Sequence, residues 1–224
     1  MKIFFPMGGR GKRFVDGGYP TPKPLLPFQG KTLLECAVAS TTRLQGSYDY
    51  LPRNEWMEEL TKLTLPGGCW HPIEKQTTGP LQTLWEAQEC LATEEEVLIM
   101  DCDSVIDAGE LQNAVEVFRA TGANGGVPIR YTHDPACSYA EVDQEWWVTS
   151  TREGEAYTAW STTGPYWFRT GHFFLMASQR AMAAHDTTVS PVYNYLGRVK
   201  AVPVSSFRHL GTPEAYERSK GAME

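Results

Sequence analysis

The residues of this chain best suited to bind a polyanion gather near its N-terminus. They are Gly8, Gly9, Arg10, Gly11, Lys12 and Arg13, with Lys23 following between prolines. A glycine backbone can approach phosphate oxygens closely, cations neutralise their charge, and proline limits where the Lys23 amine can point. The stretch, which follows the apolar run Ile3-Phe4-Phe5, predicts a phosphate-binding loop after a buried strand. It matches neither the Walker nor the dinucleotide-binding pattern, and a solvated glycine turn with surface cations is the simpler alternative.

A second candidate site is a pair of carboxylates at the end of the clearest buried strand. Residues 97–100, Val-Leu-Ile-Met, form an unbroken apolar run, which is typical of a central parallel strand covered on both faces. The run ends in Asp101-Cys102-Asp103, and open α/β sheets bind ligands at the carboxyl ends of their strands. Carboxylate oxygens suit Mg²⁺, which keeps other positions for water and phosphate. The alternative is a surface turn that caps the next helix.

A third candidate segment runs from Gln76 to Thr83 and precedes an expected helix. Thr78, Gly79 and Thr83 are residue types that cap helices well. The same backbone can present its N–H and C=O groups to a flat ligand. Both roles are compatible with the sequence.

The elements that must position these residues alternate between strands and helices. Hydrophobic spacing predicts helices over 31–43, 54–62 and 173–184, with others around Leu84 and Leu111. Strands are expected at 47–52, 69–71, 97–100, 125–129 and 199–204. This alternation predicts an α/β protein with helices on the faces of a sheet. From Ser138 onward the chain becomes β-rich and aromatic.

Composition narrows the class of protein. Hydrophobic residues at 42% and charged residues at 21% are ordinary for a globular chain. The net charge of −7 argues against a nucleic-acid partner. Five widely spaced cysteines, an odd number, argue against a disulfide framework or a zinc site and fit a reducing compartment. No apolar run reaches membrane-spanning length, so we expect a cytoplasmic protein without a membrane partner.

In combination, the motifs resemble those of the nucleotidyltransferases that activate sugar 1-phosphates with nucleoside triphosphates. The resemblance rests on the loop ending in Arg13-Phe14, on Pro22-Lys23-Pro24-Leu25-Leu26-Pro27, on Gly30-Lys31 and on the closing Gly211-Thr212. It implies that Arg13 stabilises the departing pyrophosphate and that Lys23 contacts phosphate in the transition state. The implied nucleotide-binding residues are Met7, Gly8, Gly9, Arg10, Gly11, Lys12, Thr78, Gly79, Thr83 and Asp101. The implied cofactor is Mg²⁺ on Asp103, with Asp101 as the second ligand.

On the acceptor side the chain departs from the family pattern. Gly164 and Tyr166 match the family's Gly-x-Tyr-x-Phe strand, which is implied to line the acceptor site. The preceding Glu-Lys pair corresponds to Glu153 and Gly154, so the lysine expected to hold the acceptor phosphate is missing. Neighbouring Arg152 is the candidate to replace it.

The closing motif departs as well. His209 stands where the family usually has a second aspartate as metal ligand. Histidine binds Mg²⁺ poorly, so either the site relies on Asp101 and Asp103, or the preferred metal is softer, such as Mn²⁺. A histidine that orients water or phosphate is an equal alternative.

The resemblance implies one nucleotidyltransferase domain over 1–224, with a nucleotide-binding half (1–122) and an acceptor-binding half (123–224). The expected fold is a Rossmann-like, GT-A-like three-layer α/β sandwich with a mixed, mostly parallel sheet and a smaller β-rich acceptor portion. The expected reaction joins a nucleoside triphosphate to a sugar 1-phosphate for nucleotide-sugar and polysaccharide biosynthesis. Alternatives are a cytidylyltransferase for a non-sugar phosphate, a GT-A glycosyltransferase and a non-catalytic nucleotide sensor. The aromatic second half could also form a homodimer surface.

Overall fold

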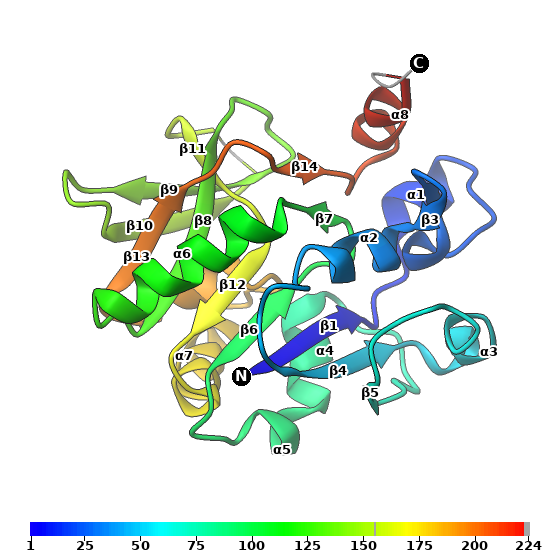
Figure 1. The fold of residues 1–224 in the computed structure, drawn as a ribbon, viewed down its shortest axis with the longest axis horizontal. Helices are drawn as coiled ribbons and strands as arrows, with labels where there is room; N and C mark the ends of the chain where they lie inside the picture. The colour runs from blue at the N-terminus through cyan, green and yellow to red at the C-terminus, as the bar shows by residue number, and fades with distance from the viewer. Residues whose placement is uncertain (155, 222–224) are drawn as a thin grey trace.

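A computed structural model describes residues 1–154 and 156–221 of the chain. Its largest sheet has the order β10-β9-β11-β8-β12-β6-β1-β4-β5, with β13 paired to β8 (Figure 1). These strands are β1 (Lys2–Met7), β4 (Ser47–Pro52), β5 (Gly68–Trp70), β6 (Val97–Met100), β8 (Gly125–Tyr131), β9 (Ser138–Val142), β10 (Val148–Glu153), β11 (Trp160–Thr162), β12 (Pro165–Phe168) and β13 (Val199–Pro203). Two small sheets pair β2 (Pro27–Phe28) with β3 (Lys31–Thr32), and β7 (Ser104–Val105) with β14 (Arg208–His209).

Helices cover both faces of the large sheet. The α-helices are α1 (Lys12–Asp16), α2 (Leu33–Ala39), α3 (Met57–Leu60), α4 (Pro80–Glu86), α5 (Gln88–Leu91), α6 (Ala108–Ala120), α7 (Gly171–Ala183) and α8 (Pro213–Gly221). Short 3-10 turns are η1 (Lys23–Leu25), η2 (Asn54–Trp56) and η3 (Ser190–Tyr195). No helix in the described ranges is both long and apolar enough to cross a bilayer.

The centre of the molecule is β1, which runs parallel to β4 on one side and to β6 on the other. Successive side chains of a strand point to opposite faces, and all three residues of Ile3-Phe4-Phe5 are fully buried. Ile3 and Phe5 pack in a cluster with residues of α2 and α6, whereas Phe4 packs with residues of α4, α5 and α7. The sheet is therefore the middle of three layers, as the sequence predicted.

Beyond β6 the sheet changes character. β12 pairs antiparallel with β6 and β8, and antiparallel pairing continues through β11, β9 and β10. Only β13, which runs parallel to β8, departs from this arrangement among the described strands. The predicted mixed α/β fold with a β-rich second half is confirmed, and most parallel pairings gather in the first half.

The C-terminal helix α8 packs against the N-terminal loop region. Phe14, Phe28 and Tyr216 belong to one buried cluster, and the Tyr216 hydroxyl donates a hydrogen bond to the Pro27 carbonyl at 2.5 Å. Thr212 caps α8 by accepting the Ala215 N–H, and Pro213 is the first helical residue, as predicted. β14, which precedes α8 in the chain, pairs with β7, the short strand that follows β6 (Figure 1).

Several element boundaries differ from the sequence expectations. The strands at 47–52 and 97–100 are found as predicted. The helix expected from Lys31 starts only at Leu33, because Lys31 and Thr32 pair with β2 and Thr32 then forms a capping box with Glu35. The helix expected over 54–62 is a 3-10 turn followed by one α-helical turn.

Candidate active site

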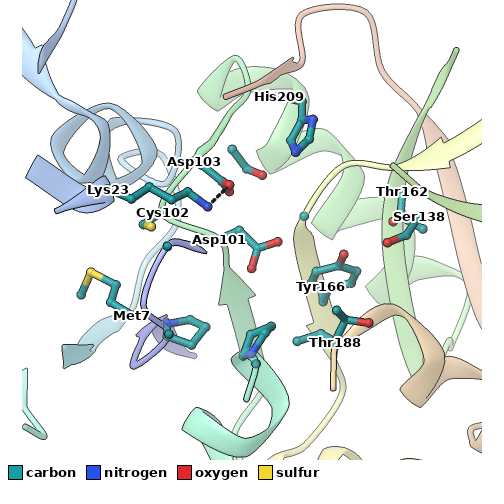
Figure 2. A pocket seen from close by; sticks show the side chains of 18 of the residues that line it. Met7, Lys23, Asp101, Cys102, Asp103, Ser138, Thr162, Tyr166, Thr188 and His209 are labelled. Atoms are coloured by element: carbon teal, nitrogen blue, oxygen red, sulfur yellow. Dashed lines mark ion pairs between the residues drawn. The ribbon is translucent and has the colours of Figure 1, made fainter. Parts of the chain in front are cut away.

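A cavity of about 290 Å³ opens where β1 and β6 end, between the two halves of the sheet (Figure 2). Its walls come from the N-terminal loop, the segment after β6, the start of α4 and the strands of the second half. Many residues proposed from the sequence meet there. They are Met7, Gly9, Gly11, Arg13, Lys23, Gly79, Thr83, Asp101, Asp103, Glu153, Gly164, Tyr166 and His209.

The glycine loop leaves β1 and turns into α1. Gly11 has φ +67°, in the left-handed region that favours glycine, and it immediately precedes the helix. Gly8 has a different constraint, since a Cβ there would lie 2.7 Å from Thr83 Oγ1 and 2.9 Å from Thr77 Oγ1. The Gly8 carbonyl also accepts the Thr77 N–H at 3.3 Å. Gly8 thus lets the loop pack directly against the start of α4.

Lys23 reaches across the cavity and forms an ion pair with Asp103, as Figure 2 shows. η1 holds Lys23 between two prolines, and the side chains of Lys23 and Asp103 are 22% and 10% exposed. Burial alone would lower the pKa of Lys23, but the Asp103 carboxylate outweighs burial and raises it. Burial likewise opposes ionisation of Asp103, and Lys23 together with His209 brings the pKa of Asp103 below its ordinary value. Both groups are therefore charged near neutral pH.

Asp101 lies beside this pair without an ion-pair partner among the described residues. Burial, and next the neighbouring Asp103 carboxylate, raises the pKa of Asp101 to about 8. Gly164 packs onto Asp101: its φ is +89°, and a Cβ there would approach Asp101 Oδ2 to 2.9 Å. Two acidic side chains therefore line the cavity beside a single lysine among the described residues, Lys23.

His209 is brought to the site by β14, which pairs with β7 so that His209 lies opposite Ser104. The next residue, Leu210, donates its N–H to the Asp103 carbonyl at 2.9 Å. Burial lowers the pKa of His209, and Asp103 partly opposes that shift. His209 Nε2 and Asp103 Oδ2 both lie within 2.6 Å of the point that a Cβ on Gly211 would occupy, so the imidazole and the carboxylate are close neighbours.

The donor set fits a hard divalent cation. Asp103, which is buried, and Asp101, which is partly buried, both place carboxylate oxygens in the cavity beside Lys23. Cys102, between them, has its pKa raised to about 12 by burial, so its thiol stays protonated.

Some residues proposed from the sequence do not line the cavity. They are Gly8, Arg10, Lys12, Thr78 and Arg152. Thr78 is exposed, and its N–H and hydroxyl both donate to Gln82 Oε1 on the first turn of α4, whose N-cap residue is Gly79. Arg152 is exposed as well and stacks over the Tyr157 ring at 4.7 Å. The structure therefore does not bring Arg152 to where the missing lysine was expected.

The acceptor side contains residues that the sequence analysis missed. Ser138, Thr162, Thr188 and Phe207 line it, and Figure 2 shows the first three facing Asp101 and Lys23 across the cavity. Ser138 donates its hydroxyl to Glu153, whereas the buried Thr188 hydroxyl has no partner among the described residues. Thr162 could have been found from its place beside Gly164. Ser138 and Thr188 carry no local sequence signal.

Comparisons with known proteins agree on the kind of domain. Residues 6–185 match the family model of the MobA-like NTP transferase domain. Among curated proteins, none matches the chain. A nucleoside-diphosphate-sugar pyrophosphorylase from Vibrio cholerae is similar in structure, with 20% identity, a TM-score of 0.78 and coverage of 98% of this chain and 99% of its own.

Two further solved structures share the fold. A putative glucose-1-phosphate thymidylyltransferase from Bacillus anthracis has 16% identity and a TM-score of 0.79, covering 99% of this chain and 94% of its own. A UDP-glucose pyrophosphorylase complexed with UDP-glucose has 14% identity and a TM-score of 0.81, covering 99% and 97%. At these identities the likeness establishes the fold.

Proposed function

This chain belongs to the MobA-like NTP transferase family, and on that premise we propose that it joins a nucleoside triphosphate to a sugar 1-phosphate, giving a nucleoside-diphosphate sugar and pyrophosphate. The observation that carries the proposal is the convergence of Arg13, Lys23 and Asp103 on one cavity. Residues 1–122 would bind the nucleotide, and residues 123–224 would bind the acceptor.

In the proposed reaction, a phosphate oxygen of the acceptor attacks the α-phosphorus of the triphosphate. A new P–O bond forms at the α-phosphorus. The bond between the α-phosphorus and the oxygen that bridges it to the β-phosphorus breaks, and pyrophosphate leaves with that electron pair. Such transfers depend mainly on positioning and on neutralisation of charge. Arg13 would offset the charge of the pyrophosphate, Lys23 would bridge phosphates, and the backbone of Gly9 and Gly11 would donate N–H groups.

A divalent cation would be held by Asp103 and Asp101, with His209 as a third candidate ligand. When bound, Mg²⁺ would supply Lewis-acid charge neutralisation beside the α-phosphate. The protein itself holds the two carboxylates just after β6. It also keeps the Lys23 amine beside Asp103, where the amine would be able to pair with the carboxylate or with a phosphate of the substrate.

The acceptor would lie against Glu153, Gly164 and Tyr166. The Glu153 carboxylate can accept hydrogen bonds from acceptor hydroxyls. The hydroxyls of Ser138 and of Thr188, which has no partner among the described residues, can accept or donate them. In the described residues, no lysine or arginine lines this side of the cavity. That observation keeps a second candidate open, a cytidylyltransferase for a phosphorylated acceptor that is not a sugar.

The test is a panel of the four nucleoside triphosphates against several sugar 1-phosphates, phosphocholine and phosphoethanolamine, with Mg²⁺, read by mass spectrometry. A nucleoside-diphosphate product with a sugar 1-phosphate supports the proposal, and one with a non-sugar phosphate supports the second candidate. A glycosyltransferase would instead consume a nucleotide sugar without releasing pyrophosphate. Binding of a triphosphate without any product would favour a sensor.

A further inference from the structure

A second pocket opens beside the candidate active site. It has a volume of about 310 Å³ and shares Phe207 and His209 with the main cavity. We call it the side pocket. Three arginines, Arg130, Arg208 and Arg218, line it together with a single carboxylate, Asp134.

The side pocket concentrates positive charge in a chain whose net charge is −7. Arg130 forms no ion pair with a carboxylate within the described residues; its guanidinium lies over the Phe207 ring at 5.1 Å, and its buried Nε has no hydrogen-bond partner there. Arg218 is 72% exposed and lies 4.0 Å from Asp134, the limit of an ion pair. The guanidinium groups of Arg130 and Arg218 therefore face one carboxylate, Asp134, which is an arrangement suited to an anion.

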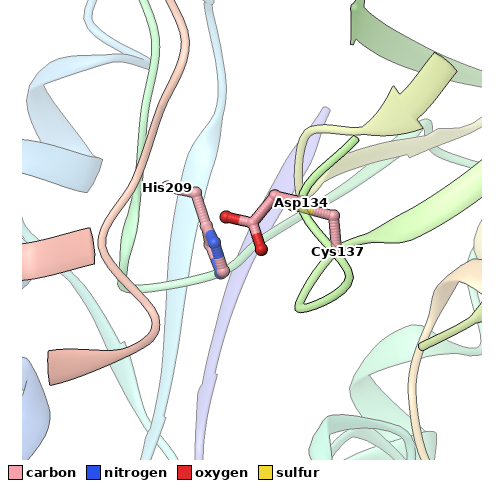
Figure 3. Close-up of side chains that lie close together, drawn as sticks. All are labelled: Asp134, Cys137 and His209. Carbon is pink, nitrogen blue, oxygen red and sulfur yellow. The ribbon is translucent and has the colours of Figure 1, made fainter. Parts of the chain in front are cut away.

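The side pocket begins one imidazole ring away from the reacting groups. Asp103 lies near Nε2 of the His209 ring, and a ring nitrogen lies within 4.8 Å of the ligand atoms of Asp134, which lines the side pocket, and of Cys137, which lines the main cavity (Figure 3). The buried Nδ1 of His209 has no hydrogen-bond partner in the described part of the chain. A ligand passing from Asp103 past His209 would thus enter a cationic pocket.

We propose that the side pocket binds a second anionic group of the acceptor, a carboxylate or a second phosphate, and so selects acceptors that carry one in addition to the reacting phosphate. The proposal rests on the proposed function. It also explains why no lysine or arginine among the described residues lines the acceptor side of the main cavity, where Gly154 replaces the expected lysine. The cations lie in the adjoining side pocket instead.

A metal ion on Asp134, Cys137 and His209 is the competing interpretation of the same place, since these side chains offer carboxylate, thiol and imidazole ligands (Figure 3). Two arginines oppose it. Arg130 lies 3.8 Å from Cys137 Sγ, and Arg218 lies near the Asp134 carboxylate. Repulsion from these guanidinium groups disfavours a divalent cation and favours an anion.

The experiment compares glucose 1-phosphate, glucuronic acid 1-phosphate and glucose 1,6-bisphosphate, which differ only at carbon 6, as acceptors for the wild type, Arg130→Met and Arg218→Gln. Methionine retains apolar packing on Phe207, and Arg218 is exposed enough to be replaced without a folding defect. Arg180→Gln, an exposed arginine on α7 outside both pockets, is the matched control. Phosphoethanolamine and phosphoserine form the equivalent pair for a non-sugar acceptor.

For the wild type we expect kcat/KM to be about 10- to 100-fold higher with an acceptor that carries the extra carboxylate or phosphate than with the matched acceptor that lacks it. This factor is the scale of one charge-assisted hydrogen bond. Arg130→Met and Arg218→Gln should lose that preference through KM for the anionic acceptor, with the neutral acceptor and the triphosphate unaffected. The carboxylate and bisphosphate arms show which anion is preferred.

Equal use of all members by the wild type would overturn the proposal, as would equal losses on neutral and anionic acceptors in the variants. A thiolate-to-metal absorption band with Co²⁺ that disappears in Cys137→Ser would overturn it in favour of the metal. If no acceptor yields pyrophosphate, the proposed function fails first. Calorimetric titration with glucuronic acid 1-phosphate then tests the side pocket separately. Binding to the wild type that is lost in Arg130→Met supports an anion site in the side pocket, and no such difference rejects the site.

Discussion

Lys23 and Asp103 form a buried ion pair across the candidate active site, one from a proline-held turn and the other from the segment after the central strand β6. Each stabilises the charged form of the other against burial. Asp103 is also the first candidate ligand for a metal ion. In the protein without ligands, Lys23 therefore neutralises the charge of the carboxylate that would otherwise bind the metal ion.

Replacing Lys23 by methionine should destabilise the metal-free protein by about 3 to 5 kcal/mol, because the buried Asp103 would lose its partner. The double variant Lys23→Met, Asp103→Asn should recover most of this loss. Urea unfolding in the presence of EDTA measures both effects. Addition of Mg²⁺ should stabilise Lys23→Met more than the wild type, and equal responses to Mg²⁺ would mean that the ion does not bind at Asp103.

Arg13→Ala should lower kcat by about two to three orders of magnitude, the scale for losing one donor to developing charge. Arg13 is exposed and lines the cavity, so its loss should leave the unfolding temperature unchanged. Steady-state pyrophosphate release measures the effect, with Arg180→Ala as the control for removing an exposed arginine. Near-normal turnover in Arg13→Ala would remove Arg13 from the mechanism.

Gly8→Ala should destabilise the protein by about 1 to 3 kcal/mol, the usual cost of overpacking, since its Cβ would press on the Thr83 and Thr77 hydroxyls. Gly9→Ala is the matched control, because a Cβ at Gly9 meets nothing within 4 Å. Thermal unfolding compares the two variants. A Gly9→Ala variant that is the less stable of the two would show that the loop does not pack on α4 in this way.

Glu110 forms hydrogen bonds with Ser205 and Ser206, in the segment between β13 and β14. It accepts hydrogen bonds from the N–H groups and hydroxyls of Ser205 and Ser206, at 2.7 to 3.1 Å for Oε2. Burial is the largest single influence on the pKa of Glu110 and would raise it, but the hydrogen bonds from Ser205 and Ser206 together outweigh burial and lower the pKa from its ordinary value of 4.5. A lowered folded-state pKa gives stability that is present above about pH 4.5 and is lost as the pH falls through the folded pKa.

Glu110→Gln should therefore lose about 1 kcal/mol at pH 7, the scale of a charged hydrogen bond at a partly exposed site, and show a flatter loss of stability below pH 4.5. Chemical denaturation at pH 7, 5 and 4 measures the slope. Parallel curves for the wild type and the variant over that range would mean that the Glu110 charge does not anchor Ser205 and Ser206.

The sequence predicted the parts of the fold and site that depend on local pattern. The apolar strand 97–100, the carboxylates after it, and the glycines and Lys23 near the N-terminus all carry a signal within a few residues. Their convergence follows from topology, since parallel strands place their carboxyl ends at one edge of a sheet. That Gly8 contacts phosphate stays a prediction; in the structure Gly8 lies outside the cavity lining and packs against Thr77 and Thr83.

The remaining site residues could not be read from the sequence, because distant segments bring them together. Ser138 is the first residue of the antiparallel strand β9, and Thr188 lies in the segment before the η3 turn; neither position follows from a local spacing rule. Arg130 on β8 and Arg218 on α8 line one pocket although they are far apart in the sequence, and α8 is held in place in part by the hydrogen bond from Tyr216 to the Pro27 carbonyl. Arg152 was the candidate to replace the missing lysine, but its guanidinium stacks on the Tyr157 ring.

The most direct measurement follows oxygen through the reaction. An acceptor whose phosphate carries ¹⁸O is incubated with Mg²⁺ and the nucleoside triphosphate that the protein uses, and both products are examined by mass spectrometry. Attack by the acceptor phosphate in the cavity of Arg13, Lys23 and Asp103 predicts that all label enters the diphosphate of the product, that one unlabelled pyrophosphate forms per product, and that Arg13→Ala slows both. Label in the pyrophosphate, or triphosphate binding with no product from any acceptor, would contradict the account.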